Sequence, residues 1–425
     1  MRESSRPYIG WVPHDWKDVR LKHVLRAPVT DGPHETPVFV DDGFPFLSVD
    51  GIQNGEIVFE GCRFISERNF LEYRRKASPE LGDLLMGKAA STGKIARVRT
   101  TQAFAIWSPL ALLKFDESTV DSRFLEYVLK TPALQQQIDD LCNANTQKNI
   151  GMGDIPKLAF ALPTLQEQLR IANFLDDKTA RIDALIAEKE QLILKLEEYW
   201  KSKAAEMVLR GLHSDVQTVE TGIPWLGEIP SHWQLVPLKS LFRLVAEAAP
   251  DNHGLQLLSL YTSIGVRPRS ELEARGNKAS STDGYWLVRE NDLVVNKLLA
   301  WMGAIAGSAY SGVTSPAYDI LRPSLTVNTW YFDALFRSDI YLPEFKSKSR
   351  GIMEMRLRLY WDQLGTVKVP CPPKMEQDEI VAELKERKSR VDVLLDHCNQ
   401  HIARLREYRS SLISAAVTGQ LDISQ

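Results

Sequence analysis

Two long stretches of the chain lack both glycine and proline and carry apolar residues at helical spacing. They run over Thr164–Arg210 and Lys374–Thr418, and glycines follow them at Gly211 and Gly419. Glycine is common just past a helix end because it adopts positive φ angles without strain. The pattern therefore predicts two helices of about 45 residues, each roughly 65 Å long at ~1.5 Å per residue.

The apolar positions within these stretches recur at intervals of three, four and seven residues, which is typical of a coiled coil. They are Ile171, Leu175, Ile182, Leu185, Leu192, Leu196 and Tyr199 in the first stretch, and Ile380, Leu384, Val391, Leu394, His401, Leu405 and Tyr408 in the second. A helix this long with one apolar stripe needs a partner, so the matching stripes favour an antiparallel pair with a globular domain at each end. The alternative is two separate amphipathic helices, each covering its own domain.

The remaining parts, about 1–160 and about 222–370, hold almost all the glycine and proline and many short apolar runs. Phe44–Val49, Phe104–Trp107 and Asp292–Val295 are examples. Short β-rich runs bounded by turn residues, with a few helical stretches, predict mixed α/β domains.

The chain contains an internal duplication, which determines how it is organised. The paired segments are Gly10–Trp16 with Gly227–Trp233, Gly82–Lys88 with Asn291–Lys297, and Pro163–Ile171 with Pro372–Ile380. The last two pairs are 209 positions apart, and identities continue along the helical stretches. We therefore expect two copies of a domain followed by a long helix, with parts at 1–160, 161–213, 214–370 and 371–425.

The motif Pro-x-x-x-Glu-Gln-x-x-Ile opens both long helices and carries a resemblance to a known family. With Thr146–Ile150 shortly before its first copy and Gly82–Leu85 further upstream, the order of motifs resembles the specificity subunit of Type I restriction-modification enzymes. The second copy departs from this pattern, because Arg356–Leu359 stands where Gln147–Ile150 would align.

This resemblance implies a fold, a function and a set of partners. The fold is mixed α/β, with two duplicated target recognition domains joined by two long antiparallel coiled-coil helices in a pseudo-twofold arrangement. Each domain would read one half of a bipartite site in double-stranded DNA, while the helices set the spacing and dock partners. The implied partners are two modification subunits, which methylate adenine, and restriction subunits, which translocate and cut DNA.

Composition and charge limit the remaining classes. Apolar residues make up 44% and charged residues 25% of the chain, as in ordinary globular proteins. No apolar run approaches the roughly 20 residues that span a membrane. The polar segment Met1–Trp16 is unlike a secretory leader and the four cysteines are scattered, so we expect reduced thiols and a cytoplasmic location. A net charge of −3 excludes a general polycation but allows a local basic groove.

Motifs for catalysis by the chain itself are missing or have simpler explanations. Gly82–Ala89 resembles a phosphate-binding loop but lacks Ser or Thr after its lysine, and its inner residues predict a strand. The sequence has neither an Asn/Asp-Pro-Pro-Tyr/Phe nor a Gly-x-Gly-x-x-Gly loop for methyl transfer. A nuclease site is unsupported, because Glu386–Lys388 lies within a helix, far from any Pro-Asp. His397, Cys398 and His401 cluster without a second group to complete a metal site.

Local basic and amide-rich segments supply candidate DNA contacts, because Lys and Arg neutralise phosphates while Arg, Gln and Asn pair with base edges. The candidates are Lys88, Ser91, Thr92, Lys94, Gln147, Lys148 and Asn149 in the first domain, and Lys297, Trp301, Lys346, Lys348, Arg350, Arg356 and Arg358 in the second. The sequence thus predicts a non-catalytic DNA-recognition subunit without a cofactor or metal. The alternatives are ordinary polar loops at any one position and, for the whole chain, a duplicated protein-interaction scaffold that does not bind DNA.

Overall fold

The structure, a computed structural model, describes residues 1–425 apart from 7, 144–147, 251–253, 273–283, 352–356 and 424–425. The chain divides into two compact units. The first unit consists of Met1–Lys189 with Asn399–Gln425, and the second consists of Glu190–Cys398. Each unit therefore holds one α/β domain and one half of each long helix. In the described part of the chain, no helix is both long and apolar enough to cross a membrane.

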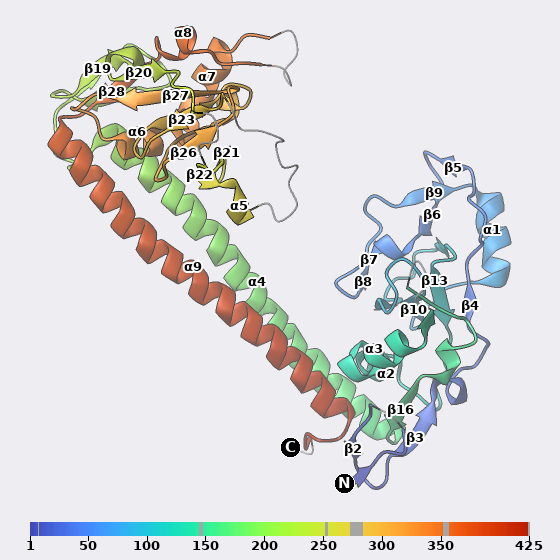
Figure 1. The fold of residues 1–425 in the computed structure, drawn as a ribbon. Coiled ribbons are helices and arrows are strands. Elements are labelled where there is room, and N and C mark those ends of the chain that lie inside the picture. The colour runs from blue at the N-terminus through green and yellow to red at the C-terminus, as the bar shows by residue number, and fades with distance from the viewer. Residues whose placement is uncertain (7, 144–147, 251–253, 273–283, 352–356, 424–425) are drawn as a thin grey trace. The chain divides into compact units, whose positions relative to one another are not determined.

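The two glycine-free stretches are helices, as predicted. They are α4 (Leu165–Arg210) and α9 (Lys374–Val417). Within each unit the two helices lie side by side (Figure 1). In the first unit the guanidinium of Arg409 in α9 donates to the carboxylate of Asp183 in α4, at 2.8 and 3.1 Å. In the second unit Val208 of α4 and Ile380 of α9 share one core. The start of each helix thus packs against the end of the other, which confirms the antiparallel pairing.

The predicted seam between the helices is wrong in part. The predicted seam residues that are exposed are Leu185, Leu192, Tyr199, Leu394, His401 and Tyr408. The buried stripe instead continues from Ile182 to Ile186 in α4 and from Val391 through Cys398 to Ile402 in α9. Adjacent apolar pairs such as Leu185–Ile186 allow two choices, because one lies three and the other four residues after Ile182, and packing against the partner helix selects the second member.

The domain of the first unit is built on two four-stranded sheets, ordered β11-β10-β13-β4 and β12-β6-β9-β5. Their strands are β4 (Thr30–Asp31), β5 (Phe39–Val40), β6 (Phe44–Leu47), β9 (Arg63–Ile65), β10 (Leu84–Gly87), β11 (Ile95–Arg97), β12 (Ala105–Ile106) and β13 (Leu110–Leu113). The first sheet is antiparallel, and β12 and β6 pair parallel in the second. All of β10 is buried, so the sequence that resembles a phosphate-binding loop is a core strand.

Shorter strands and helices complete this domain. The strands form the pairs β1 (Arg2–Glu3) with β2 (Trp11–Val12), β3 (Lys17–Arg20) with β16 (Ala159–Leu162), β7 (Ile52–Gln53) with β8 (Glu56–Ile57), and β14 (Cys142–Asn143) with β15 (Asn149–Ile150). The helices are α1 (Glu67–Lys76), α2 (Ser122–Lys130) and α3 (Pro132–Asp140). Because β16 leads directly into α4, the β3–β16 pair anchors the start of that helix to the domain.

The domain of the second unit repeats the plan around one four-stranded antiparallel sheet, β20-β27-β24-β25. Its strands are β20 (Phe242–Val245), β24 (Leu293–Asn296), β25 (Ile305–Gly307) and β27 (Tyr318–Pro323). The two-stranded pairs are β17 (Thr218–Glu220) with β18 (Glu228–Pro230), β19 (Gln234–Pro237) with β28 (Lys368–Cys371), β21 (Leu258–Tyr261) with β22 (Gly265–Pro268), and β23 (Trp286–Val288) with β26 (Gly312–Thr314). The helices are α5 (Arg269–Leu272), α6 (Thr329–Phe336), α7 (Leu342–Lys348) and α8 (Trp361–Leu364). Here β28 leads into α9, as β16 leads into α4.

The glutamine of each Pro-x-x-x-Glu-Gln motif fastens a long helix to its domain. Gln168 and Gln377 are fully buried. The side-chain oxygen of Gln168 accepts from the backbone N–H of Asp121 at 2.9 Å, and that of Gln377 accepts from the N–H of Asn328 at 2.8 Å. Asp121 and Asn328 are the N-cap residues of α2 and α6. The motif therefore forms the same structural joint in both units.

Candidate nucleic-acid interface

Two segments of the first unit that the sequence marks separately come together in the structure. The backbone N–H of Ile150 donates to the carbonyl of Lys88 at 2.9 Å. The hydroxyl of Thr92 donates to the carbonyl of Lys148 at 2.7 Å, which ties the turn after β10 to the start of β15. We call residues 88–94 together with 148–150 loop surface 1.

The second unit builds its counterpart on the same frame. The backbone N–H of Leu359 donates to the carbonyl of Lys297 at 3.0 Å. Both residues lie 209 positions after the Ile150 and Lys88 of the first unit, so the duplicated sequence forms a duplicated hydrogen bond. This agreement supports the alignment that places Arg356–Leu359 opposite Gln147–Ile150.

Further contacts join the remaining basic residues of the second unit. The backbones of Arg350 and Arg358 pair in both directions at 2.9 Å. The ammonium group of Lys346 in α7 lies 5.8 Å from the ring centroid of Trp301, within reach of a cation–π interaction. We call residues 297–302, 346–350 and 358–359 loop surface 2.

Lys88 is the one lysine of loop surface 1 that lies inside the domain. Its ammonium group is 2.9 Å from a carboxylate oxygen of Asp31, which also binds Lys76 at 2.5 Å. Burial alone would raise the pKa of Asp31, but the hydrogen bonds from Lys76 and Lys88 outweigh it and hold that pKa below its usual range. Lys88 therefore already has an ion-pair partner in Asp31, and its contact with DNA remains a prediction.

The other predicted contact residues are placed as follows. Lys94, Lys148, Asn149, Lys346, Arg350 and Arg358 are exposed, whereas Ser91, Thr92, Lys297, Trp301 and Lys348 are half-buried. Ion pairs join Lys148 to Asp139, Lys297 to Asp319 at 3.1 Å, Lys348 to Glu344 at 3.9 Å and Arg350 to Asp362 at 3.1 Å. Gln147 and Arg356 lie outside the described residues. The exposed pairs of Lys148 and Arg350 contribute little to stability, so DNA phosphates can compete for these two cations at small cost.

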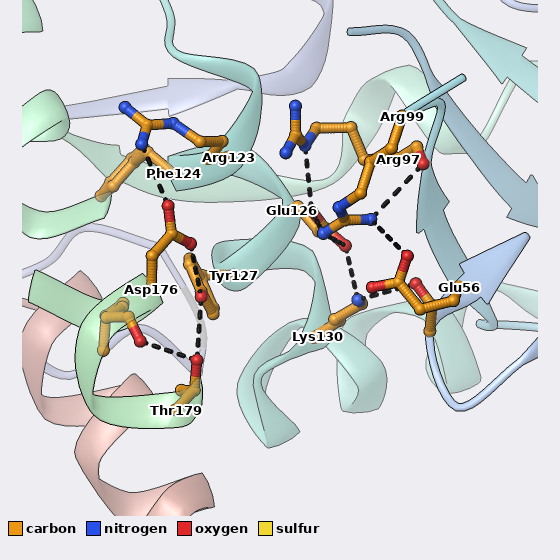
Figure 2. A network of polar contacts seen from close by, with 12 residues as sticks. Glu56, Arg97, Arg99, Arg123, Phe124, Glu126, Tyr127, Lys130, Asp176 and Thr179 are labelled. Atoms are coloured by element: carbon orange, nitrogen blue, oxygen red, sulfur yellow. Dashed lines mark hydrogen bonds and ion pairs between the residues drawn. The ribbon is translucent and has the colours of Figure 1, made fainter. Parts of the chain in front are cut away.

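A buried carboxylate that sequence reasoning missed organises the cations beside loop surface 1. Glu126 of α2 binds Arg97 at 3.3 Å, Arg99 at 2.9 Å and Lys130 at 2.6 Å (Figure 2). A second carboxylate, Glu56, binds Arg99 at 3.0 Å. The residues come from β8, β11, α2 and the segment after β11, so sequence spacing could reveal only the Glu126–Lys130 pair, four residues apart on one helix.

The same helix α2 also attaches the domain to α4. Arg123 binds Asp176 at 3.0 Å, and the hydroxyl of Tyr127 donates to the other oxygen of Asp176 at 2.8 Å (Figure 2). Burial, more than the hydrogen bonds, raises the pKa of Tyr127 well above its usual range, so the phenol stays protonated and keeps donating. These contacts add to the buried hydrogen bond of Gln168, which we call the Gln168 clamp, in attaching the domain to α4.

The arrangement is suited to binding a polyanion. Among the described residues, no group of three or more His, Cys, Asp or Glu side chains is placed to hold a metal ion. What the two units present instead are duplicated turns that carry exposed cations and amides. Such side chains can bind phosphates and base edges in the grooves of a duplex.

Comparison with known proteins gives one consistent family. Residues 13–195 match the family model of the Type I restriction modification DNA specificity domain. The chain is similar to the Type I restriction enzyme EcoDI specificity subunit of Escherichia coli, with 22% identity over 97% of this chain and 90% of that subunit.

Two solved structures have the same fold. One was solved for "Structural basis underlying complex assembly and conformational transition of the type I R-M system" and has a TM-score of 0.70 at 16% identity, covering 96% of this chain and 99% of that one. The other is the HsdS subunit from Thermoanaerobacter tengcongensis, with a TM-score of 0.54 at 17% identity, covering 96% of this chain and 98% of that one. The mixed α/β fold with long helices is thus shared along nearly the whole chain.

Proposed function

We propose that this chain, which belongs to the specificity-subunit family of Type I restriction-modification enzymes, recognises DNA through loop surfaces on both of its α/β domains. The observation that carries the proposal is the pair of equivalent hydrogen bonds, Ile150 to Lys88 and Leu359 to Lys297. They hold two turns in one backbone frame while the side chains differ. One frame with two sets of side chains is what reading two different half-sites requires.

The exposed members of both surfaces are the proposed contacts. In the first unit they are Lys94, Lys148 and Asn149, and in the second they are Lys346, Arg350 and Arg358. The lysines suit phosphates, which position the protein, whereas arginine and asparagine also form paired hydrogen bonds with purine edges. Loop surface 2 holds more arginine, so the second half-site is expected to depend more on guanine.

Recognition is the role of this subunit, and the chemistry belongs to the other subunits of the complex. The exposed apolar residues of the helices support two equivalent docking sites for two modification subunits. Leu185 and Tyr408 lie in the first unit and are 46% and 57% exposed. Their equivalents in the second unit, Leu394 and Tyr199, are 49% and 52% exposed. A duplicated apolar patch is the expected signature of two copies of one partner.

A domain exchange tests the proposal. We expect that replacing residues 1–160 by the domain of a related subunit changes one half of the methylated site and leaves the other intact. Methylated sites are mapped genome-wide in cells carrying each version. A control chimera retains Arg123 and Tyr127, because these side chains hold the domain to Asp176 of α4. A chimera that alters both half-sites, or neither, contradicts independent reading.

The alternative hypothesis, a protein-interaction scaffold, predicts the opposite result for DNA binding. In a gel shift with the partner subunits present, a scaffold without DNA contacts gives no sequence-selective complex. Recognition by this chain gives a complex that disappears when either half-site is scrambled. The family membership favours recognition over the scaffold.

A further inference from the structure

A pocket of about 350 Å³ in the first unit is lined by cations from three separate elements. Lys94 comes from loop surface 1, Lys130 is the last residue of α2, and Arg409 comes from α9. No Asp or Glu is among the lining residues. The net charge of residues 1–425 is −3, so three cations around one hollow mark a local site for an anion.

Two glycines keep this hollow open. Gly55 and Gly93 have φ angles of +80° and +89°, which other residues adopt only with strain. A Cβ on Gly55 would lie 2.5 Å from the Lys130 ammonium, and one on Gly93 would lie 2.4 Å from the Gln135 side-chain oxygen. Lys130 also donates to the Gly55 carbonyl at 3.3 Å, so the backbone holds the cation at the rim of the pocket.

The three cations differ in how far they are already neutralised. Lys130 shares the buried Glu126 with two arginines (Figure 2), so that carboxylate cannot fully compensate any of its partners. Arg409 pairs with Asp183 at 2.8 Å. The Lys94 ammonium has no hydrogen-bond or ion-pair partner among the described residues. A phosphate entering the pocket would therefore meet one unpaired cation, Lys94, and two cations, Lys130 and Arg409, that can bind it while keeping their carboxylate partners.

The second unit has an equivalent pocket with a different charge. Gly265 also has a φ of +80°, and its Cβ position lies 2.9 Å from the Arg337 guanidinium, as Gly55 lies beside Lys130. However, Trp200 stands 209 positions before Arg409 and occupies its place, and Asp333 and Asp339 line the hollow. The duplication has kept the cavity in both units but the purely cationic lining only in the first.

We propose that the Lys94–Lys130–Arg409 pocket binds a phosphate group of the DNA backbone, next to the half-site read by loop surface 1. This inference rests on the proposed function. Lys94 belongs both to loop surface 1 and to the pocket, so a strand bound on the surface continues to the pocket rim. A contact there extends the phosphate footprint of the first unit from the domain onto α9. In the second unit Asp333 and Asp339 oppose the cations Lys201, Arg337 and Lys388 of the equivalent pocket, so a phosphate is less favoured there and the footprint is asymmetric.

The salt dependence of DNA binding tests the proposal. Each phosphate contact adds about 0.9 to the slope of log K against log salt concentration. We expect Lys94→Gln and Arg409→Gln, measured by fluorescence anisotropy on the full chain with its partner subunits and a duplex carrying its site, each to lower that slope by part of this amount, and the double variant to lower it by about 0.9. Lys201→Gln, in the equivalent pocket of the second unit, should leave the slope unchanged.

Asp183→Asn separates a phosphate contact from a purely structural role of Arg409. It breaks the same ion pair but keeps the cation, so the proposal expects DNA affinity equal to or above that of the wild type. If Asp183→Asn and Arg409→Gln weaken binding equally, or if neither pocket variant changes the slope, the proposal is overturned. Thermal unfolding of each variant shows whether the fold is intact.

Three further results distinguish the source of the phosphate and separate a failure of this inference from a failure of the proposed function. In the first, inorganic phosphate is added at constant ionic strength. If it stabilises the wild type but not Arg409→Gln, and the salt slope of DNA binding is the same in both, the pocket binds free phosphate and the proposed DNA contact is overturned. A triple variant of loop surface 2, Lys346, Lys348 and Arg350 all to Gln, serves as a positive control. If it lowers the slope while the pocket variants do not, this inference fails and the proposed function stands. If the wild type binds no DNA selectively, the proposed function itself fails.

Discussion

Replacing Gln168 by leucine should loosen the joint between α4 and the first domain. The side-chain oxygen of Gln168 accepts from the N–H of Asp121 at 2.9 Å. Its amide nitrogen donates to the carbonyls of Thr119 and Pro163 at 3.1 and 3.0 Å. Leucine has a similar volume but no polar atoms. The substitution therefore leaves one N–H and two carbonyl groups without this partner at a fully buried position.

The size of the effect follows from what the leucine cannot satisfy. A buried donor or acceptor left without a partner costs about 1–3 kcal/mol. The Asp121 N–H belongs to an N-cap residue, which has no preceding turn of helix to bond to. Each carbonyl has two lone pairs and loses less. We therefore expect the free energy of unfolding of the first unit to fall by about 2–4 kcal/mol.

A matched control isolates the hydrogen bonds from the change of side chain. Gln166→Leu makes the same substitution two residues earlier, at an exposed position of α4, and should shift stability by less than about 0.5 kcal/mol. Urea unfolding measures both variants, and hydrogen exchange reports on the peptide containing Asp121. Gln377→Leu should produce the equivalent loss in the second unit. If Gln168→Leu costs no more than Gln166→Leu, the clamp does not stabilise the joint and the reasoning is wrong.

Three further predictions concern stability and spacing. The ion pairs of Asp31 hold its pKa below its usual range, so they stabilise the fold above about pH 4 and are lost as the pH falls through the lowered pKa. Asp31→Asn should therefore be less stable than the wild type at pH 7. When unfolding is measured from pH 7 to pH 3, this difference in stability should shrink in acid. Ile186→Ala should cost about 2–4 kcal/mol and Leu185→Ala much less, as measured by thermal unfolding, because only Ile186 lies on the observed seam; equal costs would restore the predicted seam. Deleting one heptad from the middle of both long helices shortens each by about 10 Å, so methylation on sites with varied spacers should prefer half-sites about three base pairs closer; a folded variant that keeps the original spacer would refute a ruler role for the helices.

The architecture was largely predictable because its signals are local. Absence of glycine and proline over more than forty residues marks α4 and α9, and the duplication marks two copies of one domain. The helix seam was less predictable. Leu185 and Ile186 are both apolar, and only the partner helix decides which one is buried. The pairing was therefore predictable from the pattern, while the facing residues required the tertiary structure.

The candidate site was predictable as segments but not as contacts. The sequence predicted DNA contacts both in the turn containing Lys88 and in the segment containing Lys148, and the structure joins the two through Thr92. The burial of Lys88 against Asp31 could not be foreseen, because the two residues are far apart in sequence and Asp31 precedes a glycine typical of a turn. The Arg409 pocket is more remote still, since it combines the domain with the far end of the chain.

The two units show why recognition can change while the joint persists. Gln168 and Gln377 bind backbone groups, which are present whatever the side chains are. The neighbouring side-chain contact does differ: the Arg123–Asp176 ion pair of the first unit is matched in the second by a lysine over an aromatic ring, Lys385 at 5.8 Å from Trp330.

Asp176 and Lys385 occupy equivalent positions in α4 and α9, 209 residues apart, yet carry opposite charges. A domain built to meet Asp176 with Arg123 would therefore place like charges together if it were moved onto α9. The backbone clamp lets either domain be grafted in principle, but the ion pair makes each helix prefer its own. Domain exchange between related subunits should accordingly succeed at the first position when the incoming α2 carries a cation facing Asp176, and should lose stability when it carries a carboxylate there.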